Sequence, residues 1–136
     1  MPAFSRLLAF GMILVGLGVL LLSWLPNPDV GSVLPVPAVI RQWVNANGNL
    51  RTAVPFVLLG TLGEGLLPPH RSNLMVRLKM GGVFLLLVVI AELGQLWLPK
   101  RHFDWRDIGY GALGTAVGMG IGFCFKHWFY SSQRHF

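Results

Sequence analysis

The sequence predicts an all-α integral membrane protein, a single domain over residues 1–136 built as a bundle of four transmembrane helices. Two features predict this class. The chain is 54% hydrophobic and only 12% charged, whereas a small soluble domain needs about twice that charged share to cover its surface. It also contains four apolar runs of 18 or 19 residues, which is the length at which an α-helix crosses a hydrocarbon core of about 30 Å. The runs lack the period-two alternation of outer-membrane barrel strands. The predicted helices span residues 7–25, 50–67, 80–98 and 108–125.

The first run is predicted to be a retained membrane anchor. Arg6 supplies the positive start of a signal peptide, but the run is longer than a typical signal core. The segment that ends it, Ser23-Trp24-Leu25-Pro26, does not have the small-x-small pattern of a cleavage site.

A proline-rich loop, residues 26–49, joins the first two runs. Within it, Val39, Ile40 and Trp43 would share one face of a helix over residues 37–45, and Arg41 would face water. This spacing is typical of a helix lying on the membrane surface. An irregular loop packed against the bundle explains the same residues.

The positive charges predict that both termini lie in the cytoplasm. Lys and Arg near the helix ends number six on the side of the termini and five on the other side, and cytoplasmic segments carry the excess. The six residues are Arg6, Arg71, Arg77, Lys79, Lys126 and Arg134. Because these cations flank apolar runs and do not gather on one face, no nucleic-acid partner is expected despite a net charge of +6.

Polar residues near the end of the third run are the candidate functional residues. Glu92 lies about 9 Å inside the predicted outer interface, and Gln95 shares its helical face. An ionised side chain at that depth normally faces protein or a water-filled cavity. Hydrogen bonding to a neighbouring helix explains the pair as well as a ligand pocket does. Arg101, just outside the run, could hold a carboxylate or a phosphate with two hydrogen bonds.

Asp104 and Asp107 precede the fourth run with the spacing of a capping box. Asp104 would be the N-cap and Asp107 the third helical residue, and both would favour the positive end of the helix dipole. Asp107 lies one turn into the helix and could instead point toward the same outer cavity as Glu92.

No catalytic group, metal site or cofactor is predicted. Glu64 and Glu92 would differ in depth by about 12 Å, which is too far for a catalytic carboxylate pair, and Glu64 is expected near Arg71 or Lys79 at the inner interface. The histidines and Cys124 have no metal-ligand spacing, and no serine has the surroundings of a nucleophile elbow.

The fourth run carries glycines at four-residue intervals. Gly114, Gly118 and Gly122 form overlapping small-xxx-small units, a surface on which another helix approaches closely. The other helix could belong to this bundle or to a partner subunit.

The polar residues and glycines together resemble the signature of VanZ-like membrane proteins over residues 80–122. The matching elements are Glu92 with Gln95, Pro99 with Arg101, Phe103-Asp104 with Asp107, and a small-residue helix from Gly111 to Gly118. Three positions depart from the pattern. Gly48-Asn49-Leu50-Arg51-Thr52 lacks the usual Asp-Lys and His, Lys100 replaces a glycine, and an Asn of the last helix is missing near Tyr110-Gly111.

The resemblance implies a polar site at the outer face made of Glu92, Gln95, Arg101, Asp104 and Asp107. The family is named for a protein linked to resistance to the glycopeptide teicoplanin, its biochemical activity is unsettled, and its members occur near envelope functions. The leading hypothesis is therefore a non-catalytic inner-membrane protein whose outer pocket binds an envelope, lipid-linked or glycopeptide ligand. The alternative is an accessory subunit that packs into a larger membrane complex through its last helix. An intramembrane enzyme or proton-coupled transporter using Glu92 is a third class.

Overall fold

The computed structural model describes residues 2–27, 29–32, 34–69 and 73–133. Within these residues the fold is all-α, with five α-helices, one short 3-10 helix and no strands. The elements are α1 (Ala3–Ser23), η1 (Val30–Ser32), α2 (Ala38–Ala46), α3 (Gly48–Leu66), α4 (Leu74–Gln95) and α5 (Trp105–Gln133).

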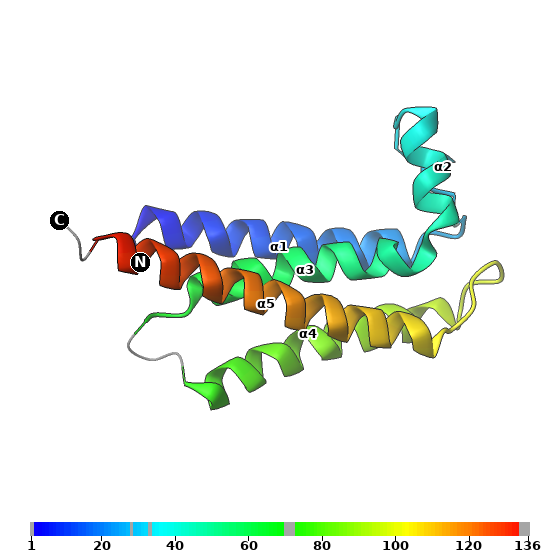
Figure 1. The fold of residues 1–136 in the computed structure, drawn as a ribbon. Helices are drawn as coiled ribbons and strands as arrows, with labels where there is room; N and C mark the ends of the chain where they lie inside the picture. Colours follow the sequence, from blue (N-terminus) through cyan, green and yellow to red (C-terminus); the bar gives the residue numbers. More distant parts are fainter. Residues whose placement is uncertain (1, 28, 33, 70–72, 134–136) are drawn as a thin grey trace.

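Four of the helices run side by side, and the fifth lies across their end (Figure 1). α3 packs against α1, α4 and α5, so it occupies the centre of the bundle. The two termini lie at one end, while α2 and the α4–α5 loop lie at the other end (Figure 1). The core where the helices meet is formed by Phe56, Leu59, Phe84 and Val88.

Among the described residues, three helices, α1, α4 and α5, are long and apolar enough to cross a membrane. α1 has no buried residue, and its large side chains are exposed, with Leu7 at 66% and Leu21 at 67%. An apolar helix in this position is stable in lipid but would expose a large hydrophobic surface to water. The predicted class of multi-pass membrane protein is therefore supported by length, composition and exposure.

The observed helix ends differ from the predicted ones. α4 begins at Leu74, not at residue 80, because the side chain of Asn73 accepts a hydrogen bond of 3.0 Å from the amide of Val76 and caps the helix. α5 extends to Gln133, well past the predicted end at residue 125. The short helix predicted at residues 37–45 is present as α2, and Val39, Ile40 and Trp43 on it are exposed at 77%, 49% and 50%. Of the charges that predicted the orientation, Arg71 and Arg134 lie outside the described residues.

The glycines of α5 meet α3 at a distance that no side chain could occupy. A Cβ on Gly114 would collide with the carbonyl oxygen of Ala53, and one on Gly118 with that of Val57. A Cβ on Gly122 would lie 2.9 Å from the Cβ of Glu64. The small-residue surface is thus covered within the chain by α3.

Glu64 is fully buried at the end of the bundle that carries the termini. Arg77 donates to it from two nitrogens, at 2.8 Å to Oε1 and 3.0 Å to Oε2, and the Nζ of Lys126 lies 3.6 Å from Oε1. The expectation of Lys79 as its partner is wrong, because Lys79 is exposed, and Arg71 lies outside the described residues. The rotation of α4 about its axis, which the sequence pattern does not determine, selects Arg77.

Candidate functional site

The loop between α4 and α5 carries Arg101 and Asp104, and the other predicted polar residues lie on the helices that flank it. Three backbone hydrogen bonds fold it into consecutive turns, from Leu96 to Leu93, Leu98 to Gln95 and Arg101 to Leu98. Pro99 cannot continue a helix, which fits the end of α4 at Gln95. The loop therefore lies directly over the last turn of α4.

Asp104 begins α5. Its Oδ1 accepts a hydrogen bond of 2.8 Å from the amide of Arg106, which satisfies one of the free amides of the first turn. Asp104 is exposed and its side chain does not line the cavity described below. The structure thus places Asp104 as a helix cap.

Glu92 completes this cap from α4. Its Oε2 accepts from the backbone amide of Asp104 at 3.2 Å, and its Oε1 accepts from Nε2 of Gln95 at 3.0 Å. In the predicted capping box, the carboxylate of Asp107 would accept a hydrogen bond from the amide of Asp104. This prediction is wrong, because that amide donates to Glu92. The carboxylate comes from Glu92 on another helix, and Asp107 lies near Thr52 of α3. Both Glu92 and Gln95 are buried and hydrogen-bonded, so the local structure offsets their cost in the bilayer.

Arg101 ties the loop to the end of α1. Its Nε donates to the carbonyl of Leu25 at 3.0 Å, and a terminal nitrogen donates to that of Leu22 at 3.1 Å. The last carbonyls of a helix have no partner within the helix, so Arg101 caps α1 from outside it. Burial lowers the pKa of Arg101, the charge of Arg51 lowers it further, and the carboxylates of Glu92 and Asp107 act in the opposite direction.

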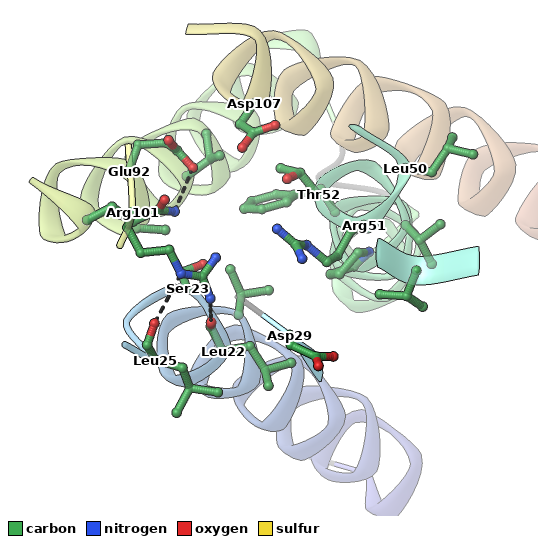
Figure 2. Close-up of a pocket in the computed structure, with 18 of the residues that line it drawn as sticks. Leu22, Ser23, Leu25, Asp29, Leu50, Arg51, Thr52, Glu92, Arg101 and Asp107 are labelled. Atoms are coloured by element: carbon green, nitrogen blue, oxygen red, sulfur yellow. Dashed lines mark hydrogen bonds between the residues drawn. The ribbon is translucent and has the colours of Figure 1, made fainter. Parts of the chain in front are cut away.

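These side chains surround a cavity of about 310 Å³ at the end of the bundle where α2 lies. Figure 2 shows the carboxylates of Glu92 and Asp107 entering it from α4 and α5, and the guanidinium groups of Arg51 and Arg101 facing them from α3 and the loop. The other wall is apolar. It is formed by Val19, Leu22, Leu25, Trp43, Val44, Leu50, Val54, Pro55, Phe56, Val88 and Ala91.

Four of the five predicted ligand-binding residues line this cavity, namely Glu92, Gln95, Arg101 and Asp107. The cavity is also lined by Arg51 and Thr52, near the start of α3, which the sequence pattern did not single out. The signal in the sequence was Arg51 itself, a cation inside the apolar run of residues 50–67, which was interpreted only as a charge flanking a membrane helix. The rotation of α3 about its axis, which the sequence pattern does not determine, turns Arg51 toward the α4–α5 loop.

A segment ahead of α2 forms one edge of the cavity. Asp29, which lines it, accepts hydrogen bonds from the amide of Gly31 at 3.0 Å, from Asn45 at 3.0 Å, and from two nitrogens of Arg41. The Arg41 guanidinium, then Asn45 and Gly31, hold the pKa of Asp29 far below its usual range. This clasp, formed by Asp29, Arg41 and Asn45, fixes α2 beside the cavity.

The cavity has the character of a binding site with one charged end. A ligand pocket of this kind is mostly apolar and carries a few placed polar groups. Among the described residues, no group of three or more His, Cys, Asp or Glu side chains is placed to hold a metal ion. No protein family, curated protein or solved structure matches this chain.

Proposed function

We propose that this protein is a non-catalytic, multi-pass protein of a bacterial inner membrane whose cavity binds an amphiphilic envelope or lipid-linked ligand. The cavity of about 310 Å³ carries this proposal, because charged groups gather at one end and an apolar wall forms the rest. An amphiphile matches both parts, since its headgroup would meet the charges and its tail the apolar wall.

We include in this proposal that α3 forms a fourth membrane crossing. Its polar Glu64 has no exposed surface and is neutralised by Arg77 and Lys126, as intramembrane acids require. A fourth crossing also agrees with both termini lying at one end of the bundle (Figure 1). The cations Arg77 and Lys126 at that end favour a cytoplasmic location for it.

In the same arrangement, α2 would lie in the outer interface of the membrane. It runs across the end of the bundle (Figure 1), and its exposed Val39, Ile40 and Trp43 would enter the boundary between headgroups and acyl chains. The clasp to Asp29 would then connect the membrane surface to the mouth of the cavity.

The resemblance to VanZ-like proteins supports a role in the envelope. Of the five residues that it implies as a site, Glu92, Gln95, Arg101 and Asp107 share one cavity. The stretch that departs from the family pattern, Gly48 to Thr52, contributes Arg51 and Thr52 to the same cavity. By this analogy the ligand belongs to the cell envelope, and a glycopeptide-related ligand is one candidate.

A pair of neighbouring substitutions tests the proposal. Leu22 lines the cavity, and Leu21 beside it does not. Leu22→Trp should fill part of the cavity and reduce the ligand that co-purifies from native membrane in mild detergent, measured by mass spectrometry of the extracted small molecules. Leu21→Trp should leave it unchanged. Equal small-molecule content in wild type and Leu22→Trp would refute the proposal.

An accessory subunit is the second candidate. The glycine surface that suggested it is covered by α3, so a partner would use the open side of α5. There an apolar groove is formed by Val117, Gly120, Ile121, Cys124, Phe125 and Trp128. A stoichiometric protein partner in native mass spectrometry would favour this candidate, and a protein-free particle would favour the binding role.

A further inference from the structure

The cavity contains both acidic and basic side chains, and the two kinds lie on different sides of it. Glu92 and Asp107 enter from α4 and α5, and Arg51 and Arg101 enter from α3 and the loop (Figure 2). Within the part of the chain that the structure describes, Arg101 forms no ion pair with Glu92 or Asp107. Its hydrogen bonds go to the carbonyls of Leu22 and Leu25. Arg101 therefore faces the two carboxylates across the cavity without pairing with either of them.

Two like charges on one side make that space attractive to an anion. The charge of Arg51 lowers the pKa of Arg101, which means that the two guanidinium groups repel each other. An anion between them would relieve the repulsion, and the planar fork of Arg matches phosphate and carboxylate oxygens. A simple anion, however, would also face the carboxylates of Asp107 and Glu92.

We propose that the cavity binds a zwitterionic headgroup, in which a phosphate or carboxylate lies next to a primary ammonium. The anionic part would contact Arg51 and Arg101, and the ammonium would donate its hydrogen bonds toward Asp107. This inference rests on the proposed function and adds the chemical class of the ligand. It explains why both signs line one cavity, which a neutral, purely anionic or purely cationic headgroup does not.

The dimensions of the cavity fit a headgroup whose tail remains in the bilayer. A volume of about 310 Å³ is at the small end of the range for ligand pockets, which begins at about 300 Å³. Leu22 on α1 and Val54 on α3 line the cavity and are also exposed at 43% and 49%. In the proposed binding mode, the tail would leave the cavity past these two side chains, between α1 and α3, toward the surrounding lipid.

Headgroup competition tests this inference on the full-length protein. The protein is placed in phosphatidylcholine nanodiscs with equal amounts of phosphatidylethanolamine, phosphatidylglycerol and diacylglycerol that carry identical acyl chains. Retained lipids are then counted by native mass spectrometry. Phosphatidylethanolamine, with its phosphate and primary ammonium, should be retained about tenfold over each of the others, the effect of one charge-assisted hydrogen bond.

Charge substitutions assign the two parts of the headgroup. Asp107→Asn should abolish the preference over phosphatidylglycerol, and Arg51→Gln should abolish the preference over diacylglycerol. The exposed neighbours Asp104 and Arg106 do not line the cavity, so Asp104→Asn and Arg106→Gln should retain both preferences. Thermal unfolding of each variant identifies any loss that comes from misfolding.

The outcomes separate this inference from the proposed function. If phosphatidylglycerol is retained as well as phosphatidylethanolamine by the wild type, the zwitterion inference is wrong, whatever the variants do. If Leu22→Trp still lowers bound lipid in that case, the binding role stands without it. Soluble phosphoethanolamine distinguishes the source: displacement of the lipid by it supports the same chemistry in a soluble ligand, and lack of displacement supports a lipid.

Discussion

The close contact between α3 and α5 makes a strong prediction at Gly118. A Cβ added there would lie 2.8 Å from the carbonyl carbon of Val57 and 3.0 Å from the amide nitrogen of Thr61. Ordinary contacts begin at 3.4 Å, and the carbonyl oxygen of Val57 is closer still. The Gly118→Ala substitution therefore requires the two helices to separate by more than about 0.6 Å, which tightly packed backbones resist. The obstructing atoms belong to the backbone of α3, so no side-chain rotation relieves the collision.

The expected cost of Gly118→Ala has two parts. Overpacking of a tight interface costs about 1–3 kcal/mol. The hydroxyl of Thr61 donates to the carbonyl of Gly118 at 3.1 Å, and the separation would weaken this hydrogen bond, which within a membrane is worth about 0.6 kcal/mol. The free energy of unfolding should therefore fall by about 2–4 kcal/mol.

Gly120 provides the matched control two residues away. No atom lies within 4 Å of the position that its Cβ would take, so Gly120→Ala should be neutral or stabilise the helix by up to about 1 kcal/mol. Both variants can be unfolded with sodium dodecyl sulfate in mixed micelles and followed by tryptophan fluorescence and circular dichroism. Equal stability of the two variants would refute the packing of α5 on α3 described above.

Three further predictions concern the charged residues. Arg77→Met should destabilise the protein by about 3–5 kcal/mol because it leaves the buried Glu64 without its main partner, and Lys79→Met, at an exposed position, should change stability by less than about 0.5 kcal/mol; similar losses in the two would count against the pairing. The lowered pKa of Asp29 means that its clasp is fully present above the ordinary value of 3.8 and is lost only as the pH falls below it. Hydrogen exchange of α2, corrected for intrinsic rates, should stay slow from neutral pH to about 4, and Asp29→Asn should accelerate it at every pH; a wild type that loosens near pH 6 would contradict this assignment. Asp104→Ala should cost about 1 kcal/mol through loss of the cap of α5, whereas Asp104→Asn should cost little in the same denaturation assay, so an equal loss for both would exclude capping.

The apolar pattern predicted the main elements of the fold. Long apolar runs located α1, α4 and α5 because a helix in lipid must be apolar on its exposed side. The residues that face neighbouring helices were less predictable. Glu64 was expected near Arg71 or Lys79. Arg71 lies outside the described residues, and the rotation of the helices pairs Glu64 with Arg77 and Lys126 and not with Lys79.

The candidate site was predictable in its residue types but not in its connections. Glu92 and Gln95 were identified because polar groups are costly inside an apolar run, and Asp107 was identified because of its spacing from Asp104 at the start of the next helix. The local spacing predicted that Asp107 accepts the hydrogen bond from the amide of Asp104. In the structure Glu92 accepts it, through a contact between α4 and the start of α5. Arg51 was missed for the same reason, since only tertiary packing brings α3 next to the loop.

The buried ion cluster around Glu64 has a consequence for biogenesis. The two cations that neutralise Glu64 come later in synthesis, Arg77 by 13 residues and Lys126 by 62. When α3 leaves the ribosome its acid has neither partner, and an isolated carboxylate disfavours transfer of the helix from the translocon into lipid. In the proposed arrangement, in which α3 crosses the membrane, its stable integration awaits α4 and α5. A nascent chain arrested before Lys126 should therefore remain accessible to the insertion machinery and to membrane proteases.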